Sequence, residues 1–366
     1  MQIQKIPLHL HTQKDGVIAQ SVEQRTENPC VPGSIPGDTT SSKSGICIPD
    51  FSLFRQREKF VLPVLVSVMK MKFFYGILIA ILLTNGKAIA QTPLKNTGEQ
   101  IALFLKDKKA TVGVSVLTDD DKIILYNNSL HFPLLSVFKF HVALAVLDKL
   151  NNEKISLDNT LRIKSVQLRP HTYSPLRDKY PGQDITLSFK ELLQYSISLS
   201  DNNACDILID YAGGITSVQE YIQKLGIKEC CLSATEDFMH QDNQNQLLNQ
   251  STPLAVVKLM KIAYTKTLFD SSYKDFLWQT MSETSTGTDK LKGKLPANVW
   301  IGHKTGSSDR TKEGIKIADN DAGLIILPNG RQYYIAVFVM NSSETDQTNA
   351  AIIAHISKLV YDSMVQ

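Results

Sequence analysis

Apolar runs typical of β-strands lie near both ends of the region 91–366, and a long helical stretch separates them. The runs are at 111–117, 123–126, 299–304, 322–327 and 333–340. The acidic turn Asp119-Asp120-Asp121 between the first two runs and Pro328-Asn329-Gly330 between the last two are typical of hairpins. We predict that all five runs combine into one antiparallel five-stranded sheet. This order restricts the fold most, because segments far apart in the sequence must meet.

The other segments have helical patterns. Helices are expected at about 94–108 and 346–365, where they flank the sheet, and through the stretch from Ser136 to about Met281. Within that stretch, Ser188 and Glu191 form a capping box, and Ser251-Thr252-Pro253 opens a further helix with proline at its first position.

The predicted fold class is therefore α/β (α+β), with the sheet flanked by the terminal helices. The sheet belongs to an α/β lobe of residues 91–130 and 285–366, and residues 131–284 form an inserted all-helical lobe. We expect a ligand site in the cleft between the two lobes.

Residues 69–90 have the layout of a secretory signal peptide. Lys70 and Lys72 form a positive start, Phe73–Leu83 an apolar core, and Ala88-Ile89-Ala90 a cleavage site. The apolar core is too short to span a bilayer, which needs about 20 residues. We expect cleavage after Ala90, export to the periplasm and no stable membrane anchor.

The 68 residues before this segment show no sustained strand or helix period, and the stretch AQSVEQRTENPCVPGSIP within them resembles the translation of a transfer-RNA gene. We predict that Met69 or Met71 is the true start of the protein. Residues 1–90 contain 10 of the 39 basic and 6 of the 36 acidic side chains, which leaves a net charge of −1 for residues 91–366. With no basic run in that region, nucleic-acid binding is not expected, and we expect a monomer.

The cysteines of the predicted mature chain fit neither a disulfide framework nor a zinc site. They are Cys205, Cys230 and Cys231, an odd number that includes an adjacent pair. Cys205 lies in an apolar helical run and is interpreted as a small buried residue. No motif indicates a metal or another cofactor.

The first candidate for chemistry is Ser136-Val137-Phe138-Lys139, at the start of a helix that is apolar on nearly every side. Ser136 and Lys139 lie one turn apart on the same face. A lysine buried there must be paired or have a lowered pKa. Alone the motif is weak, because Ser-x-x-Lys also occurs at Ser67 and Ser271. A capping serine with a lysine that extends to solvent is the alternative.

Two further clusters strengthen the first. Ser200-Asp201-Asn202 follows Ser136 by 64 residues at a break between helices, and Lys304-Thr305-Gly306 comes 104 residues later at the end of a strand. Singly, they could be a helix cap and a strand-end turn. Together, in this order, they are the motif set of class A β-lactamases and penicillin-binding proteins.

Residues 91–366 resemble the serine β-lactamases of class A, whose fold is shared with D,D-peptidases. The segments LLSVFKFHVA, SLSDNNACDILI, TEDFMHQDNQ and GHKTGSS look most like the extended-spectrum PER, VEB and CfxA subgroup. The resemblance implies hydrolysis of penicillins and cephalosporins through an acyl-enzyme on Ser136, and hence antibiotic resistance. Either Lys139 or Glu236, acting through water, would be the base for acylation, and Glu236 would activate the water that deacylates.

The resemblance also implies roles for the other site residues. Ser200 would pass a proton to the leaving lactam nitrogen, and Lys139 and Lys304 would adjust the acidity of the Ser200 hydroxyl. The backbone N–H groups of Ser136 and Ser307 would form the oxyanion hole. The expected substrate-binding residues are Lys304, Thr305, Gly306 and Ser307 for the carboxylate, Asn202 for the acylamino group and Tyr173 as an aromatic wall.

Three further residues have less direct tasks. Asp201 is expected to fix its loop. His240 stands where many class A enzymes have an asparagine and is a candidate for positioning the deacylating water. Arg310 is interpreted as a surface arginine, with help in binding the substrate carboxylate as the alternative.

Two other functions use similar motifs. A penicillin-binding D,D-peptidase has the same serine and lysine chemistry but lacks the deacylating glutamate, so its β-lactam adduct persists. A β-lactam sensor domain is acylated and signals, but needs a membrane-spanning segment.

Overall fold

The computed structural model describes residues 93–365 of the chain. The predicted leader at 1–68 and the signal peptide at 69–90 lie outside the described residues. Within these residues, no helix is long and apolar enough to span a membrane.

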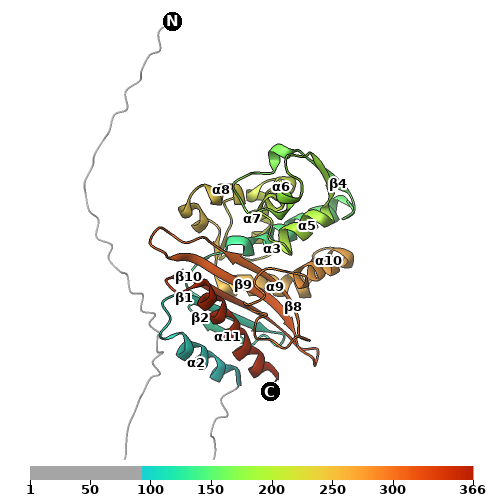
Figure 1. The fold of residues 1–366 in the computed structure, drawn as a ribbon. Coiled ribbons are helices and arrows are strands. Elements are labelled where there is room, and N and C mark those ends of the chain that lie inside the picture. The colour runs from blue at the N-terminus through green and yellow to red at the C-terminus, as the bar shows by residue number, and fades with distance from the viewer. Residues whose placement is uncertain (1–92, 366) are drawn as a thin grey trace, which may run out of the picture. The chain divides into compact units, whose positions relative to one another are not determined.

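A five-stranded antiparallel sheet forms the centre of the fold (Figure 1). Its strands, in the spatial order β2-β1-β10-β9-β8, are β1 (Thr111–Thr118), β2 (Ile123–Tyr126), β8 (Trp300–Ser307), β9 (Lys316–Ile326) and β10 (Gln332–Ser342). Strand β1 pairs with β10 along its whole length, from Thr111 opposite Met340 to Thr118 opposite Tyr333. The two ends of the described chain thus share one sheet, as predicted.

Strand β9 begins six residues before the predicted start at 322. The added part, Lys316–Asp321, includes the buried polar residues Asp319, Asn320 and Asp321. An apolar-run criterion cannot detect such a strand, because its side chains are buried through hydrogen bonds and ion pairs rather than through apolar contact.

Helices α2 (Pro93–Leu105) and α11 (Asp346–Val365) cover one face of the sheet (Figure 1). Their apolar side chains form a core with the strands, in which Ile101 and Ile353 are fully buried beside Val114 and Ile335. The range of α11 agrees with the prediction, whereas α2 ends three residues earlier than predicted, before the polar residues Lys106-Asp107-Lys108.

The opposite face carries the other helices. These are α3 (Phe138–Glu153), α4 (Pro175–Lys179), α5 (Phe189–Ile197), α6 (Asn202–Ala212), α7 (Ile215–Lys224), α8 (Glu236–Gln241), α9 (Pro253–Thr265) and α10 (Ser271–Ser282). Helix α9 packs on β1 and β10, and α10 packs on β8. The predicted capping box at Ser188 and the cap by Thr252 before Pro253 are both present.

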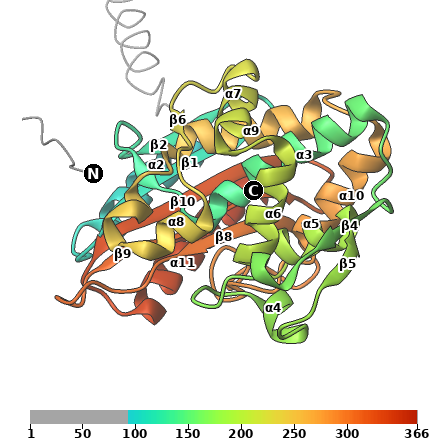
Figure 2. The same ribbon diagram turned by 90° about the horizontal axis from the view of Figure 1, so that it is seen from above.

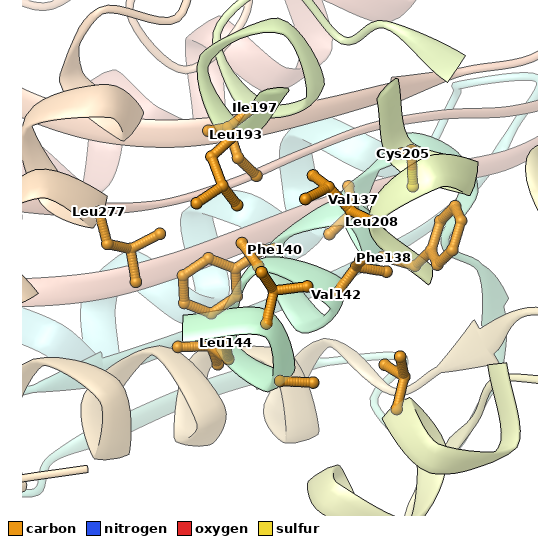
Figure 3. Packing of buried hydrophobic residues seen from close by; sticks show 14 of the residues in the cluster. Val137, Phe138, Phe140, Val142, Leu144, Leu193, Ile197, Cys205, Leu208 and Leu277 are labelled. Atoms are coloured by element: carbon orange, nitrogen blue, oxygen red, sulfur yellow. The ribbon is translucent and has the colours of Figure 1, made fainter. Parts of the chain in front are cut away.

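Helix α3 lies at the centre of this layer (Figure 3). Every residue from Phe138 to Leu147 is buried. Phe140 points toward Leu193 of α5 and Leu277 of α10, whereas Phe138 lies beside Cys205, which is fully buried as predicted. A helix enclosed on all sides explains the lack of a polar stripe in its sequence.

Short strands interrupt the helical stretch, so the prediction of an all-helical lobe was too simple. Strands β4 (Thr160–Ile163) and β5 (Ile185–Ser188) form a two-stranded antiparallel sheet next to α5 (Figure 2), and β3 (Phe132–Pro133), β6 (Cys230–Cys231) and β7 (Gln250–Ser251) form a small three-stranded sheet. Runs of two to four residues are too short to show an alternating pattern.

Candidate active site

A pocket of about 660 Å³ opens beside the end of β8, between the turn before α3 and the first residues of α6 and α8. The sequence-predicted residues that line it are Ser136, Tyr173, Ser200, Asn202, Glu236, His240, Thr305, Gly306 and Ser307. Lys139 and Lys304 lie beneath its floor with no solvent exposure. Five segments far apart in the sequence therefore meet at one pocket.

Ser136 lies in a single 3-10 turn, Leu135–Val137, directly before α3. The sequence analysis placed it at the start of the helix itself. Leu135 has a left-handed backbone (φ +47°), which a buried leucine seldom adopts, and Ser136 caps no helix. The alternative interpretation as a capping serine is therefore wrong.

Lys139 is enclosed by acceptors. Its Nζ donates to the Ser200 carbonyl oxygen (2.7 Å) and to Asn202 Oδ1 (2.5 Å), and it forms an ion pair with Glu236 Oε1 (3.1 Å). Three acceptors match the three N–H bonds of an ammonium group. Lys139 is thus paired and does not extend to solvent.

Glu236 begins helix α8, and its carboxylate is almost fully buried. The Ser136 hydroxyl donates to its Oε1 at 3.4 Å, the same oxygen that contacts Lys139. The backbone N–H groups of Glu236 and Asp237 donate to the two carboxylate oxygens of Asp206 on α6, at 2.7 and 2.8 Å. Burial, together with the charge of Glu236, raises the pKa of Asp206 to about 7.

Ser200 lies between α5 and α6 with a left-handed backbone (φ +58°). Its hydroxyl oxygen accepts from Lys304 Nζ at 2.9 Å, and Lys304 also donates to the carbonyl oxygen of Thr305. Burial, and then the nearby charge of Lys139, hold the pKa of Lys304 well below its usual range.

Asn202 and His240 connect the two sides of the pocket. His240 Nδ1 lies 2.8 Å from the carbonyl oxygen of Glu236, and its Nε2 lies 3.3 Å from Asn202 Nδ2. Since a carbonyl only accepts and an amide nitrogen only donates, the neutral ring with its proton on Nδ1 satisfies both contacts. Asn202 Nδ2 also donates to the hydroxyl of Thr172 at 2.6 Å.

Asp201 and Arg310 lie away from the pocket. The Asp201 carboxylate is fully buried and accepts from the Ser174 hydroxyl and from the N–H groups of Leu176 and Ala204, so it caps α6 and holds the neighbouring loop. Arg310 pairs with Asp346 on the protein surface, at 2.5 Å.

Comparisons with known proteins identify the family of the chain. The model of the β-lactamase enzyme family matches residues 96–364. The chain belongs to this family. A β-lactamase from Bacteroides uniformis is 54% identical to our enzyme over 295 residues, which are 80% of this chain and 100% of the relative. The extended-spectrum β-lactamase PER-1 from Pseudomonas aeruginosa is 41% identical over 74% of this chain and 88% of its own.

Solved structures give the same result. A class A β-lactamase from Bacteroides cellulosilyticus DSM 14838 is 64% identical, with a TM-score of 0.73 over 75% of this chain and 98% of that chain. The extended-spectrum β-lactamase TLA-1 is 46% identical, with a TM-score of 0.74 over 75% of this chain and 100% of its own. The predicted resemblance to class A and its extended-spectrum members is confirmed.

The pocket of this β-lactamase includes residues that the sequence analysis missed. Lys290 and Lys316 line it although both are nearly buried, and Lys290 forms an ion pair with Asp319 on β9 (2.5 Å). Thr286 contacts the hydroxyl of Thr305 at 2.6 Å. None of these lies in a short motif. Asp206, which the sequence analysis also missed, does not line the pocket but holds Glu236. It had a usable signal, because it lies one helical turn after Asn202.

Proposed function

We propose that this β-lactamase opens the β-lactam amide of penicillins and cephalosporins through an acyl-enzyme on Ser136, which water activated by Glu236 then hydrolyses. The observation that carries the proposal is the shared oxygen of Glu236, which lies 3.4 Å from the Ser136 hydroxyl and 3.1 Å from Lys139 Nζ. A carboxylate so placed can take a proton from a water bound beside the acyl carbon.

The contacts of Lys139 favour Glu236 as the base for acylation as well. As an ammonium group, Lys139 has a separate acceptor for each of its three N–H bonds, so it has no lone pair for the Ser136 proton. The Ser136 hydroxyl already points to Glu236. In our proposal Lys139 holds the carboxylate in place and lowers the cost of its burial.

The oxyanion hole in our proposal consists of the Ser136 and Ser307 N–H groups. Within residues 93–365, the N–H of Ser136 donates to no backbone or side-chain acceptor, so it is available to a developing oxyanion. Gly306 permits the close approach of the two segments, because a Cβ there would lie 3.1 Å from the Ser136 nitrogen.

Ser200 is the proposed proton donor to the lactam nitrogen. Its oxygen is occupied by the donor Lys304, which leaves the hydroxyl proton free to point into the pocket. Lys304 with Thr305, Gly306 and Ser307 would bind the substrate carboxylate at the end of β8.

The opposite wall would hold the substrate side chain. Asn202 would bind the acylamino group, and Tyr173, which is 57% exposed, would form the aromatic wall, since both line the pocket. Both ring nitrogens of His240 contact protein atoms. We therefore propose that His240 acts on the water through the orientation of Glu236 and Asn202, rather than by binding the water itself.

The decisive test uses residues 91–366 and the variant Glu236→Gln. We expect many turnovers of a penicillin for the parent. For the variant we expect an acyl-enzyme on Ser136 that persists and is visible by mass spectrometry. Stoichiometric acylation without turnover in the parent would instead favour a D,D-peptidase or a sensor domain.

We also propose that the enzyme is made with a signal peptide at 69–90 and is released into the periplasm after cleavage behind Ala90. The match of 80% of this chain to a whole β-lactamase supports a start near Met69 or Met71. Mass spectrometry of the cell-associated precursor tests this, because peptides from Ile3–Arg57 would contradict it. We further propose a monomer that binds no nucleic acid, which light scattering with and without DNA would test.

A further inference from the structure

We propose that Asn320 is a positioning residue for Ser136: its side-chain amide ties β9 to the turn that carries Ser136 and so sets the distance between the Ser136 N–H and the end of β8. This inference rests on the proposed function of Ser136. It concerns a residue that has no place in the predicted chemistry and does not line the pocket.

The Asn320 amide is fixed at both ends. Its Nδ2 donates to the carbonyl oxygen of Pro133 at 2.6 Å and lies 3.4 Å from that of Leu134. Its Oδ1 accepts from the backbone N–H of Val339 on β10 at 3.2 Å. Since carbonyls only accept and a backbone N–H only donates, the amide cannot be reversed without the loss of these contacts. The side chain is fully buried, so water cannot replace them.

Asn320 is also directly opposite Gly306 in the β8–β9 pairing. Paired residues of antiparallel strands lie on the same face of a sheet. A Cβ on Gly306 would lie 2.6 Å from the Leu134 carbonyl oxygen and 3.1 Å from the Ser136 nitrogen. The turn before α3 therefore rests on the bare backbone of Gly306, while the neighbouring Asn320 side chain holds the same turn from β9.

The turn requires such a restraint because its backbone is strained. Leu135, between the held carbonyl of Leu134 and the N–H of Ser136, has a φ of +47°. A left-handed conformation at a non-glycine residue persists only where its surroundings determine it. On the side of the small three-stranded sheet, the Leu134 N–H donates to the Asn249 carbonyl oxygen, and within the turn the Val137 N–H donates to the Leu134 carbonyl oxygen.

The neighbours of Asn320 on β9 contact other segments of the chain. Asp319 binds Lys290, and Asp321 accepts from the Leu291 N–H and contacts His303. Asn320 alone of the three faces the Ser136 turn, and it must be neutral with a donor, because it meets two carbonyl oxygens. A carboxylate of the same shape would point an acceptor at acceptors.

Loss of the Asn320 contacts should affect the transition state more than substrate binding. A shift of the turn moves the Ser136 N–H away from the oxyanion, whereas the carboxylate-binding residues on β8 stay in place. Loss of one oxyanion donor reduces kcat about 100- to 1000-fold in other enzymes. A displaced donor still stabilises the oxyanion in part, so the loss is smaller than for a removed donor. We therefore expect kcat to fall roughly tenfold or more while KM changes little.

The test compares Asn320→Asp with Asn349→Asp. Asn349 on α11 is equally buried and accepts from the Ser342 hydroxyl, on the other side of the sheet from the pocket. Both variants introduce a buried carboxylate, so they share the general cost in stability. We measure kcat and KM for a penicillin and inhibition by an arylboronic acid, which forms a tetrahedral adduct with an active serine.

We expect Asn320→Asp alone to lose kcat and to bind the boronic acid at least fivefold more weakly. Equal losses in both variants, or an unchanged kcat and boronic-acid affinity in Asn320→Asp, would overturn the inference. If Asn320→Asp does not fold, Asn320→Ser gives the same comparison, because its hydroxyl is too short to reach Pro133. Failure of the proposed function itself is distinct, since the parent enzyme would then show no turnover.

Discussion

The Asp206 carboxylate holds the first turn of α8, and with it Glu236, against α6. The charged form of this anchor is unfavourable, because its own burial and the nearby negative charge of Glu236 both oppose ionisation. Its pKa is raised from 3.8 to about 7 by burial and by that charge. Asp206 therefore takes up a proton on folding at mildly acidic pH.

This linkage predicts how stability depends on pH. The folded protein binds more protons than the unfolded chain between about pH 4 and pH 7, so the Asp206 contribution to stability falls as the pH rises through this window. The variant Asp206→Asn has no titratable group at this position, so its stability does not fall for this reason as the pH rises. We expect the free energy of unfolding of the variant, relative to the parent, to rise by on the order of 2 kcal/mol between pH 4.5 and pH 7.5. Urea unfolding at several pH values measures it, and a constant difference would contradict the prediction.

At the scale of elements, α6 organises the site. Asp201 caps its start, Asn202 in its first turn contacts Lys139 and His240, and Asp206 one turn later holds α8. One rigid helix thus fixes both the floor and the wall of the pocket. Residues on a rigid element keep a more precise geometry than residues on a loop.

The cap of α6 predicts a large loss of stability. Asp201→Ala removes an N-cap, worth about 1 kcal/mol, and leaves the buried Leu176 N–H without an acceptor, which costs roughly 1–3 kcal/mol more. We expect a total of about 3 kcal/mol in urea unfolding. Thr252→Ala removes only the cap of α9 and should cost about 1 kcal/mol. Equal losses in the two variants would show that Asp201 acts only as a cap.

The same elements show what the sequence could predict. The apolar strands, the capped helices and the motifs around Ser136, Ser200 and Lys304 were predicted, because each has a local pattern. The start of β9 and the contacts of Asp206 and Asn320 were not, because the polar residues there have distant partners, such as Glu236, 30 positions from Asp206, and Pro133, 187 positions from Asn320. Periodicity shows which face is buried, but a buried polar network has no period.

At the scale of the whole molecule, the sheet connects the two ends of the described chain. Strand β10 lies between β1 and β9, so the hairpin of β1 and β2 has no partner until the C-terminal strands are present. The core on the helical side includes Tyr334 and Phe338 of β10 together with Phe140 of α3. Neither the sheet nor the helical layer can lose its packing alone.

We therefore predict that the sheet and the helical layer unfold in one cooperative transition. Amide protons of β10 and of α3 should exchange only through global unfolding, with the same free energy of opening and the same dependence on denaturant. Native-state hydrogen exchange followed by mass spectrometry measures both in one experiment, and the exposed turn at Asn329 and Gly330 between β9 and β10 serves as the internal control for local opening. A lower opening energy for α3 than for β10 would mean that the helical layer unfolds while the sheet persists, and the shared core would then be too weak to couple them.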